Sequence, residues 1–230
     1  MKKILTTLVV LGLTTFSANA LERGDFSVTA GIAANSAVYG ASGKETNREE
    51  DNTVKSIKKE SGVFVESHQS GFIELNAGDF ISIGFEHTPD SISTPENKSR
   101  EGLSTEAKVS VDFNDLNSVY LKLNVPGGIY LKAGMVETDL DVKETMGSGS
   151  SYNNASTEGT ILGLGYQRDL GDRGFAVRFE TSYMELDDVT SNNGVAEDGG
   201  SSANGGRNQI DVSSMEGLNA KLALTFTFGN

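Results

Sequence analysis

The sequence predicts an all-β fold, namely an eight-stranded antiparallel up-and-down transmembrane β-barrel. Apolar and polar residues alternate with period two far more often than with the helical period of 3.6. Each alternating run is bounded by Gly, Asn, Asp or Pro, which supply turn geometry. The connections between runs are short and long in alternation, which in a barrel sends every short turn to one rim and every long loop to the other.

Eight runs satisfy this pattern. They cover about Asp25 to Gly40, Gly62 to Asn76, Phe80 to Thr88, Ala107 to Val125, Ile129 to Asp139, Thr160 to Arg168, Phe175 to Met184 and Leu218 to Phe228. In the last run Leu218, Leu222 and Phe226 share one face, and Lys221 and Thr225 lie on the other. A strand that crosses a membrane must offer lipid such an apolar side.

The fourth run is the longest, and we interpret it as one continuous strand. Its apolar residues, among them Phe113 and Leu121, hold a single odd register that only Asp115 and Asn117 interrupt. A break at Asp115 would need a hairpin that restores the register by chance. It would also give nine strands, a poor number for a bacterial barrel with both termini at the same rim.

The connections between the strands fall into two sets. The short ones are Ala77 to Asp79, Pro126 to Gly128 and Asp169 to Gly174. The long ones are about Ala41 to Ser61, Pro89 to Leu103, Asp141 to Glu158 and Asp187 to Ser214. Within them, Lys44 to Glu60 is densely charged and Asn192 to Asn208 is rich in Gly, Ser and Asn, so we expect mobile, solvated loops. Both termini then lie at the periplasmic rim.

The first twenty residues have the composition of an export signal. A basic start at Lys2 and Lys3 is followed by the apolar run Ile4 to Phe16 and by small residues up to Ala20. We therefore expect residues 1–20 to be a cleaved signal peptide and residues 21–230 to form the barrel. The chain has no cysteine, which excludes an acylated anchor and a disulfide framework. A net charge of −13 argues against nucleic acid as a partner.

The polar faces of the strands predict a filled interior. Eight strands leave room only for side chains inside the barrel. The candidate residues of this lumen network share the polar register of their strands, and they are Glu74, Glu86, Lys108, Asp112, Lys122, Lys132, Arg178, Glu180 and Lys221. Their charges nearly balance, so we expect ion pairs and hydrogen bonds among them, because isolated buried charges cost several kcal/mol.

The export signal, the eight strands, the loop asymmetry and the aromatic end of the last strand together resemble a known group. They are similar to the small outer-membrane barrels of Gram-negative bacteria, the OmpA, OmpX and Opa-like proteins. The resemblance implies an outer-membrane location, with lipid and lipopolysaccharide as surroundings and recognition of the C-terminal strand by the barrel-assembly machinery. It also implies long loops that meet an extracellular partner. In this chain Gly229 and Asn230 follow the final aromatic residue, Phe228.

Signals for catalysis, metals or cofactors are weak. His68 and His87 have no metal-ligand spacing, and Gly163 and Gly165 lie in a strand with no helix after them, so no phosphate loop is formed. We expect no cofactor, no metal site and no enzyme activity. One open hypothesis pairs His87 with Asp187 and Asp188 as acid and base on the outer rim. Another places Ca²⁺ or Mg²⁺ at two acidic loop clusters, Glu49-Glu50-Asp51 and Glu197-Asp198.

The sequence therefore favours a barrel with a structural or surface-interaction role. A small passive channel for ions or polar solutes is the first alternative. A soluble ligand-binding barrel is the second, because an apolar interior would give the same alternation.

Overall fold

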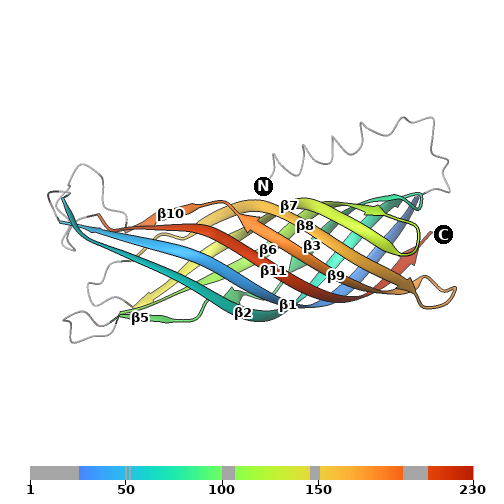
Figure 1. The fold of residues 1–230 in the computed structure, drawn as a ribbon, viewed down its shortest axis with the longest axis horizontal. Coiled ribbons are helices and arrows are strands. Elements are labelled where there is room, and N and C mark those ends of the chain that lie inside the picture. The colour runs from blue at the N-terminus through green and yellow to red at the C-terminus, as the bar shows by residue number, and fades with distance from the viewer. Residues whose placement is uncertain are drawn as a thin grey trace.

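Antiparallel strands wind around a closed ring in the computed structural model, which describes residues 26–49, 51, 53–99, 107–145, 151–193 and 207–229 (Figure 1). The expected signal peptide, residues 1–20, lies outside the described residues. Within them the strands are β1 Phe26–Arg48, β2 Val54–Ala77, β3 Ile81–Thr88, β4 Ile92–Ser93, β5 Asn97–Ser99, β6 Ala107–Asn124, β7 Ile129–Thr145, β8 Ala155–Asp169, β9 Phe175–Leu186, β10 Val189–Asn192 and β11 Gln209–Phe228.

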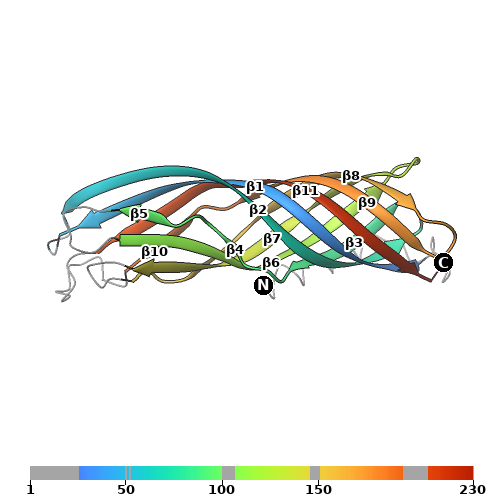
Figure 2. The same cartoon turned by 90° about the horizontal axis from the view of Figure 1, so that it is seen from below.

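Eight of the described strands form the ring. Their order is β1-β2-β3-β6-β7-β8-β9-β11, and pairing of β11 with β1 closes it. The short strands β4 and β5 pair with β6, and β10 pairs with β11 (Figure 2). The predicted fold class, an eight-stranded antiparallel up-and-down barrel, is confirmed. No helix in the described parts of the chain is long and apolar enough to cross a membrane.

The three short turns lie at one end of the barrel, as predicted, together with the end of β11 (Figure 1). They join β2 to β3, β6 to β7 and β8 to β9. Gly127 and Gly128 have φ values of 95° and 87° in the second of these turns. This left-handed region is costly for other residues, so the glycines explain why the chain reverses there.

An apolar belt covers the outside of the barrel near the short-turn end. The exposed side chains in it include Phe26, Ile32, Ile73, Leu75, Phe80, Phe85, Leu121, Leu123, Leu131, Leu162, Leu164, Tyr166, Phe175, Phe179, Leu222, Leu224 and Phe228. Leu121 and Leu222 are 42% and 50% exposed, while Lys122 and Arg178 are buried. A soluble barrel would reverse this arrangement, so that alternative was wrong.

Several strands are much longer than the sequence predicted. A barrel strand needs about 9–11 residues to cross a membrane, whereas β1 has 23, β2 has 24 and β11 has 20. They continue past the belt at the long-loop end, so the predicted loop from Ala41 to Ser61 is mostly strand. Parts of the other three long loops are also strand, because β4, β5, β10 and the ends of β7, β8 and β11 lie there.

The reason for this error is physical. Beyond the lipid both faces of a strand can meet water or other polar groups, so the apolar alternation that marks a membrane strand is lost. The stretch from Lys44 to Glu60 was therefore wrongly interpreted as a mobile loop, although it forms the far end of the β1–β2 hairpin. Thr53 closes the turn by donating two hydrogen bonds to Asp51 Oδ1, at 3.0 and 2.6 Å, and these lower the pKa of the Asp51 carboxyl.

The fourth predicted strand is continuous, as expected, but its register changes at a β-bulge. Asp115 has a φ of 50°, and the pairing of β6 with β7 shifts between Asn114 and Asn117. A bulge adds one residue to one strand, so side chains before and after it change faces. Phe113 therefore packs inside the barrel, although the sequence placed it on the lipid side.

The same bulge reverses the predicted orientation of two side chains that the sequence placed in the lumen. Lys108 lies 3.3 Å from Glu96 Oε1, and Asp112 accepts a 2.7 Å hydrogen bond from the exposed Ser93 hydroxyl. Both side chains are on the outer side of β6, away from the interior. The prediction that Lys108 and Asp112 belong to the lumen network was therefore wrong.

The buried charges of the described interior lie toward the short-turn end. Toward the other end the interior has an apolar cluster of Val136, Leu186 and Met215, together with buried hydroxyl groups such as those of Thr157 and Ser191. Other apolar side chains pack against this cluster, and they are Ala41, Phe113, Leu116, Met184, Val189 and Val212. The sequence did not predict this second, apolar section.

Candidate functional site

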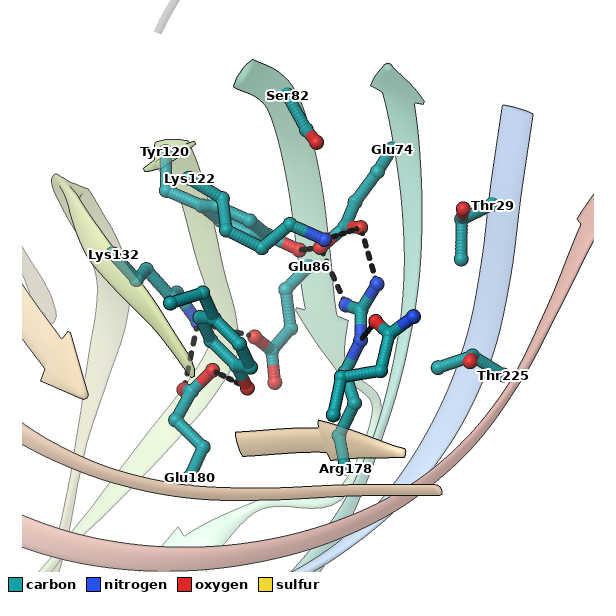
Figure 3. A network of polar contacts seen from close by, with 12 residues as sticks. Thr29, Glu74, Ser82, Glu86, Tyr120, Lys122, Lys132, Arg178, Glu180 and Thr225 are labelled. Carbon is teal, nitrogen blue, oxygen red and sulfur yellow. Dashed lines mark hydrogen bonds and ion pairs between the residues drawn. The ribbon is translucent and has the colours of Figure 1, made fainter. Parts of the chain in front are cut away.

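Seven of the nine predicted lumen residues meet inside the polar section of the barrel. They are Glu74, Glu86, Lys122, Lys132, Arg178, Glu180 and Lys221, and all are buried. Figure 3 shows most of them pointing from different strands toward the barrel axis. The pleat explains the arrangement, because each residue holds the inward register of its strand. We call these seven residues the ion network.

Glu74 is held by two cations. Arg178 donates from both terminal nitrogens to the two Glu74 oxygens at 2.7 Å, in the bidentate geometry that a guanidinium favours. Lys122 Nζ lies 2.5 Å from Glu74 Oε2, and the Tyr120 hydroxyl donates to Oε1 at 3.0 Å. Gln167 accepts a 2.7 Å bond from Arg178 Nε. The carboxylate thus has the partners that a buried charge requires.

Glu86 and Glu180 share two lysines. Lys132 Nζ lies 2.9 Å from Glu86 Oε2 and 3.2 Å from Glu180 Oε1. Lys221 Nζ lies 2.6 Å from Glu86 Oε1 and 3.2 Å from Glu180 Oε1. The Tyr130 hydroxyl donates to Glu180 Oε2 at 2.9 Å. Each lysine therefore links two carboxylates that come from separate parts of the ring.

Two like charges face each other across one strand pair. Lys122 and Lys132 are direct cross-strand partners on β6 and β7, an arrangement that is destabilising by itself. Carboxylates from β2, β3 and β9 offset it by reaching across the barrel. The network therefore ties together strands that share no backbone pairing, such as β2 and β9.

Two inward tyrosines, which the sequence reasoning missed, lie flat against glycines of neighbouring strands. A Cβ added to Gly84 would come within 2.3 Å of the Tyr120 ring, and one added to Gly165 would come within 2.1 Å of the Tyr130 ring. Both tyrosine hydroxyls donate to the ion network. The signal in the sequence was an inward glycine beside an inward tyrosine in the next strand.

A chain of uncharged groups extends the network to β1. Asn219 donates to Asn35 at 3.0 Å, Asn35 donates to Ser70 at 3.0 Å, and Ser70 donates to Glu86 at 2.7 Å. A second group at the short-turn end joins Thr29 to Asn76 at 2.9 Å. With these contacts, all eight strands of the ring contribute a polar side chain to the interior.

The ion network crosses the width of the lumen. Three carboxylates and four cations meet across its width, and cation–π contacts such as Lys132 over the Tyr120 ring, at 4.2 Å, take up further space. An open vestibule of about 680 Å³ lies at the short-turn rim and ends at Lys122 and Arg178. On the other side of the network lie two small cavities of about 50 and 40 Å³.

The residues considered for catalysis and metal binding are not brought together. His87 Nδ1 lies 2.8 Å from Asn117 Oδ1, and the described contacts join it to neither Asp187 nor Asp188. In the described part of the chain no three His, Cys, Asp or Glu residues are placed to hold a metal ion. Glu50, Glu197 and Asp198, named in the cation hypothesis, lie outside the described residues.

Comparison with known proteins gives structural neighbours only. No family model and no curated protein match the chain. Among solved structures, the outer membrane protein OprG from Pseudomonas aeruginosa is similar, with a TM-score of 0.54 and 9% identity over 86% of this chain and 96% of OprG. The chain has an outer-membrane β-barrel fold. Because its apolar belt requires lipid and its fold is that of outer-membrane proteins, this barrel is a protein of the outer membrane.

Two further outer-membrane proteins match the chain at lower similarity. AlkL has a TM-score of 0.45 and 13% identity, over 93% of this chain and 94% of AlkL. The outer membrane protease OmpT from Escherichia coli has a TM-score of 0.46 and 11% identity, over 92% of this chain and all of OmpT. The fold alone assigns no activity to this barrel.

Proposed function

We propose that this barrel is a sealed anchor, without enzyme activity, that presents a stiff β-structure outside the outer membrane for contact with a surface partner. The observation that carries the proposal is the closed ion network. A lumen crossed by seven paired charges offers a solute no continuous path, and opening it would leave buried charges without partners.

The length of the strands supports the surface role. At the far end, residues 54–70 of β2 pair with β1, while pairing with β3 starts only at Gly71. Val54, Ile57, Val63 and Val65 are exposed along this stretch. A strand edge that pairs with no other described strand and carries exposed apolar residues is a common place for a partner to bind.

Three further parts of the proposal come from the sequence. Export would use residues 1–20 as a cleaved signal, and the barrel-assembly machinery would recognise the C-terminal strand. Lipopolysaccharide would surround the outer half of the belt. The partner at the far end would be extracellular, because the short-turn end faces the periplasm in barrels of this kind.

Conductance of the purified barrel in planar bilayers tests the proposal. We expect no stable current steps from the natural chain. A matched variant, Glu74→Ala with Lys122→Ala and Arg178→Ala, removes the carboxylate together with both cations that hold it, and so widens the lumen without leaving any of the three alone. We expect this variant to show small, stable steps.

One observation favours a passive channel as the second candidate. The vestibule of about 680 Å³ already reaches from the short-turn rim to Lys122 and Arg178, so a narrow path would need only a modest change beyond them. Stable current steps from the natural chain would support this channel and contradict the sealed anchor.

A further inference from the structure

Two cavities adjoin inside the barrel, at the boundary between its polar and apolar sections. Their volumes are about 50 and 40 Å³, and Tyr39, Leu116 and Met184 line both. The first lies against the ion network, with Glu86 and Lys221 in its wall. The second continues into the apolar section. The two cavities therefore lie side by side, the first against polar groups and the second among apolar ones.

The polar end contains two buried atoms without a hydrogen-bond partner. They are His68 Nδ1 and Asn219 Oδ1, and both residues line the first cavity. His68 is only 8% exposed. Nearly all buried polar groups in proteins are paired, so these two atoms, which line the same cavity, can take a bound molecule as their partner. Asn219 Oδ1 accepts hydrogen bonds, and that partner must therefore be a donor.

This partner is neutral. Lys221 and Glu86, the charged groups in the same wall, lie 2.6 Å apart and neutralise each other. A charged head group would lie in this buried space without a counter-ion, at a large cost in free energy. A hydroxyl or an amide donates to Asn219 Oδ1 without that cost.

The apolar end fits a short hydrocarbon tail. Phe64, Ile92, Phe113 and Met215 line the second cavity. Methionine side chains adapt easily to the shape of a ligand, and Met184 lines both cavities while Met215 lines the second. A cavity of roughly 150 Å³ is known to bind benzene, so cavities of 50 and 40 Å³ limit the ligand to a few heavy atoms.

We propose that this space binds a small neutral amphipathic molecule, whose hydrogen-bond-donating head meets His68 and Asn219 and whose short apolar tail lies between Met184 and Met215. The natural ligand class is that of short-chain alcohols and amides. Binding leaves the ion network closed, so the site acts as a receptor pocket within a sealed barrel.

Methyl NMR of the full chain in lipid nanodiscs tests the proposal, with 1-butanol as the probe and ¹³C-labelled methionine methyl groups as reporters. Met184 and Met215 report on the site. Met135 lies on the outward register of β7 and reports on butanol dissolved in lipid. We expect saturable shifts at Met184 and Met215, and only a gradual, unsaturable change at Met135.

Two variants make the test specific. His68→Leu with Asn219→Leu removes the polar end, and we expect butanol affinity to fall by about two- to tenfold, the effect of one hydrogen bond. Binding of n-butane, which has no head group, should be unchanged or stronger. Ala41→Phe fills the second cavity and should abolish the saturable shift at Met215. A heat-modifiability gel checks that each variant folds.

Three results would overturn the proposal. The first is the absence of saturable shifts in the natural chain, which would mean that water alone occupies the space. The second is equal affinity for butanol in the natural chain and in the folded His68→Leu/Asn219→Leu double variant. The third is butane binding as tightly as butanol.

Discussion

At the scale of single residues, the barrel depends on charges that are buried together. Glu74 accepts hydrogen bonds from three side chains of β6 and β9, and all three are buried. The polar period-two register predicted that these residues point inward. It did not predict which acid meets which base, because those pairs span strands that are distant in sequence and are set by the closure of the ring.

Replacing Glu74 by Ala should destabilise the barrel strongly. Arg178 and Lys122 would stay buried without their carboxylate, and breaking such a pair costs about 3–5 kcal/mol. Urea unfolding from lipid vesicles measures the free energy of unfolding. Lys143→Ala is the control, because that side chain is 58% exposed and should change stability by less than about 0.5 kcal/mol. Equal losses in the two variants would contradict a stabilising ion network.

Gly84→Val should also destabilise the barrel, through Tyr120. The added side chain would overlap the tyrosine ring and move its hydroxyl away from Glu74. Overpacking of this kind costs about 1–3 kcal/mol, measured by the same urea unfolding. Gly71→Ala is the matched control, since the nearest atom to its added Cβ is 4.0 Å away. Equal stability of Gly84→Val and Gly71→Ala would contradict the claim that the Tyr120 ring requires a glycine at position 84.

At the scale of elements, the strands inside the belt could be predicted from the sequence and the strands beyond it could not. Lipid on one side enforces the alternation that marks residues 218–228, whereas water beyond the belt removes that pressure from residues 41–61. The bulge at Asp115 shows another limit. A single extra residue inverted the faces of half a strand, and only the polar residues Asp115 and Asn117 marked its place.

Trimming the β1–β2 hairpin should separate the surface role from the membrane fold. Gly43 and Glu60 are direct partners, so residues 44–59 can be replaced by an Asn-Gly turn that keeps the register. We expect the trimmed barrel to fold and to remain heat-modifiable, because the removed residues lie beyond the belt. Cells that display it should adhere less to host-cell layers than cells with the natural chain. Unchanged adherence would mean that the hairpin takes no part in the proposed contact with a surface partner.

At the scale of the whole molecule, the barrel has a membrane section and an outer section with different interiors. The membrane section has lipid outside and paired charges inside, while the outer section has water outside and an apolar cluster with buried hydroxyl groups inside. The sequence predicted the first section, with its short turns and aromatic final strand. It missed the second, because the apolar interior there comes from a shifted register and from short strands such as β4 and β10.

Fluorescence quenching by brominated lipid tests most directly whether the outward apolar face meets the bilayer. The chain has no tryptophan, so Leu222→Trp and Lys59→Trp each place a single reporter, one in the belt and one on the outer hairpin. We predict strong quenching for Leu222→Trp and almost none for Lys59→Trp. Equal quenching at the two positions, or quenching at Lys59→Trp alone, would contradict the membrane placement.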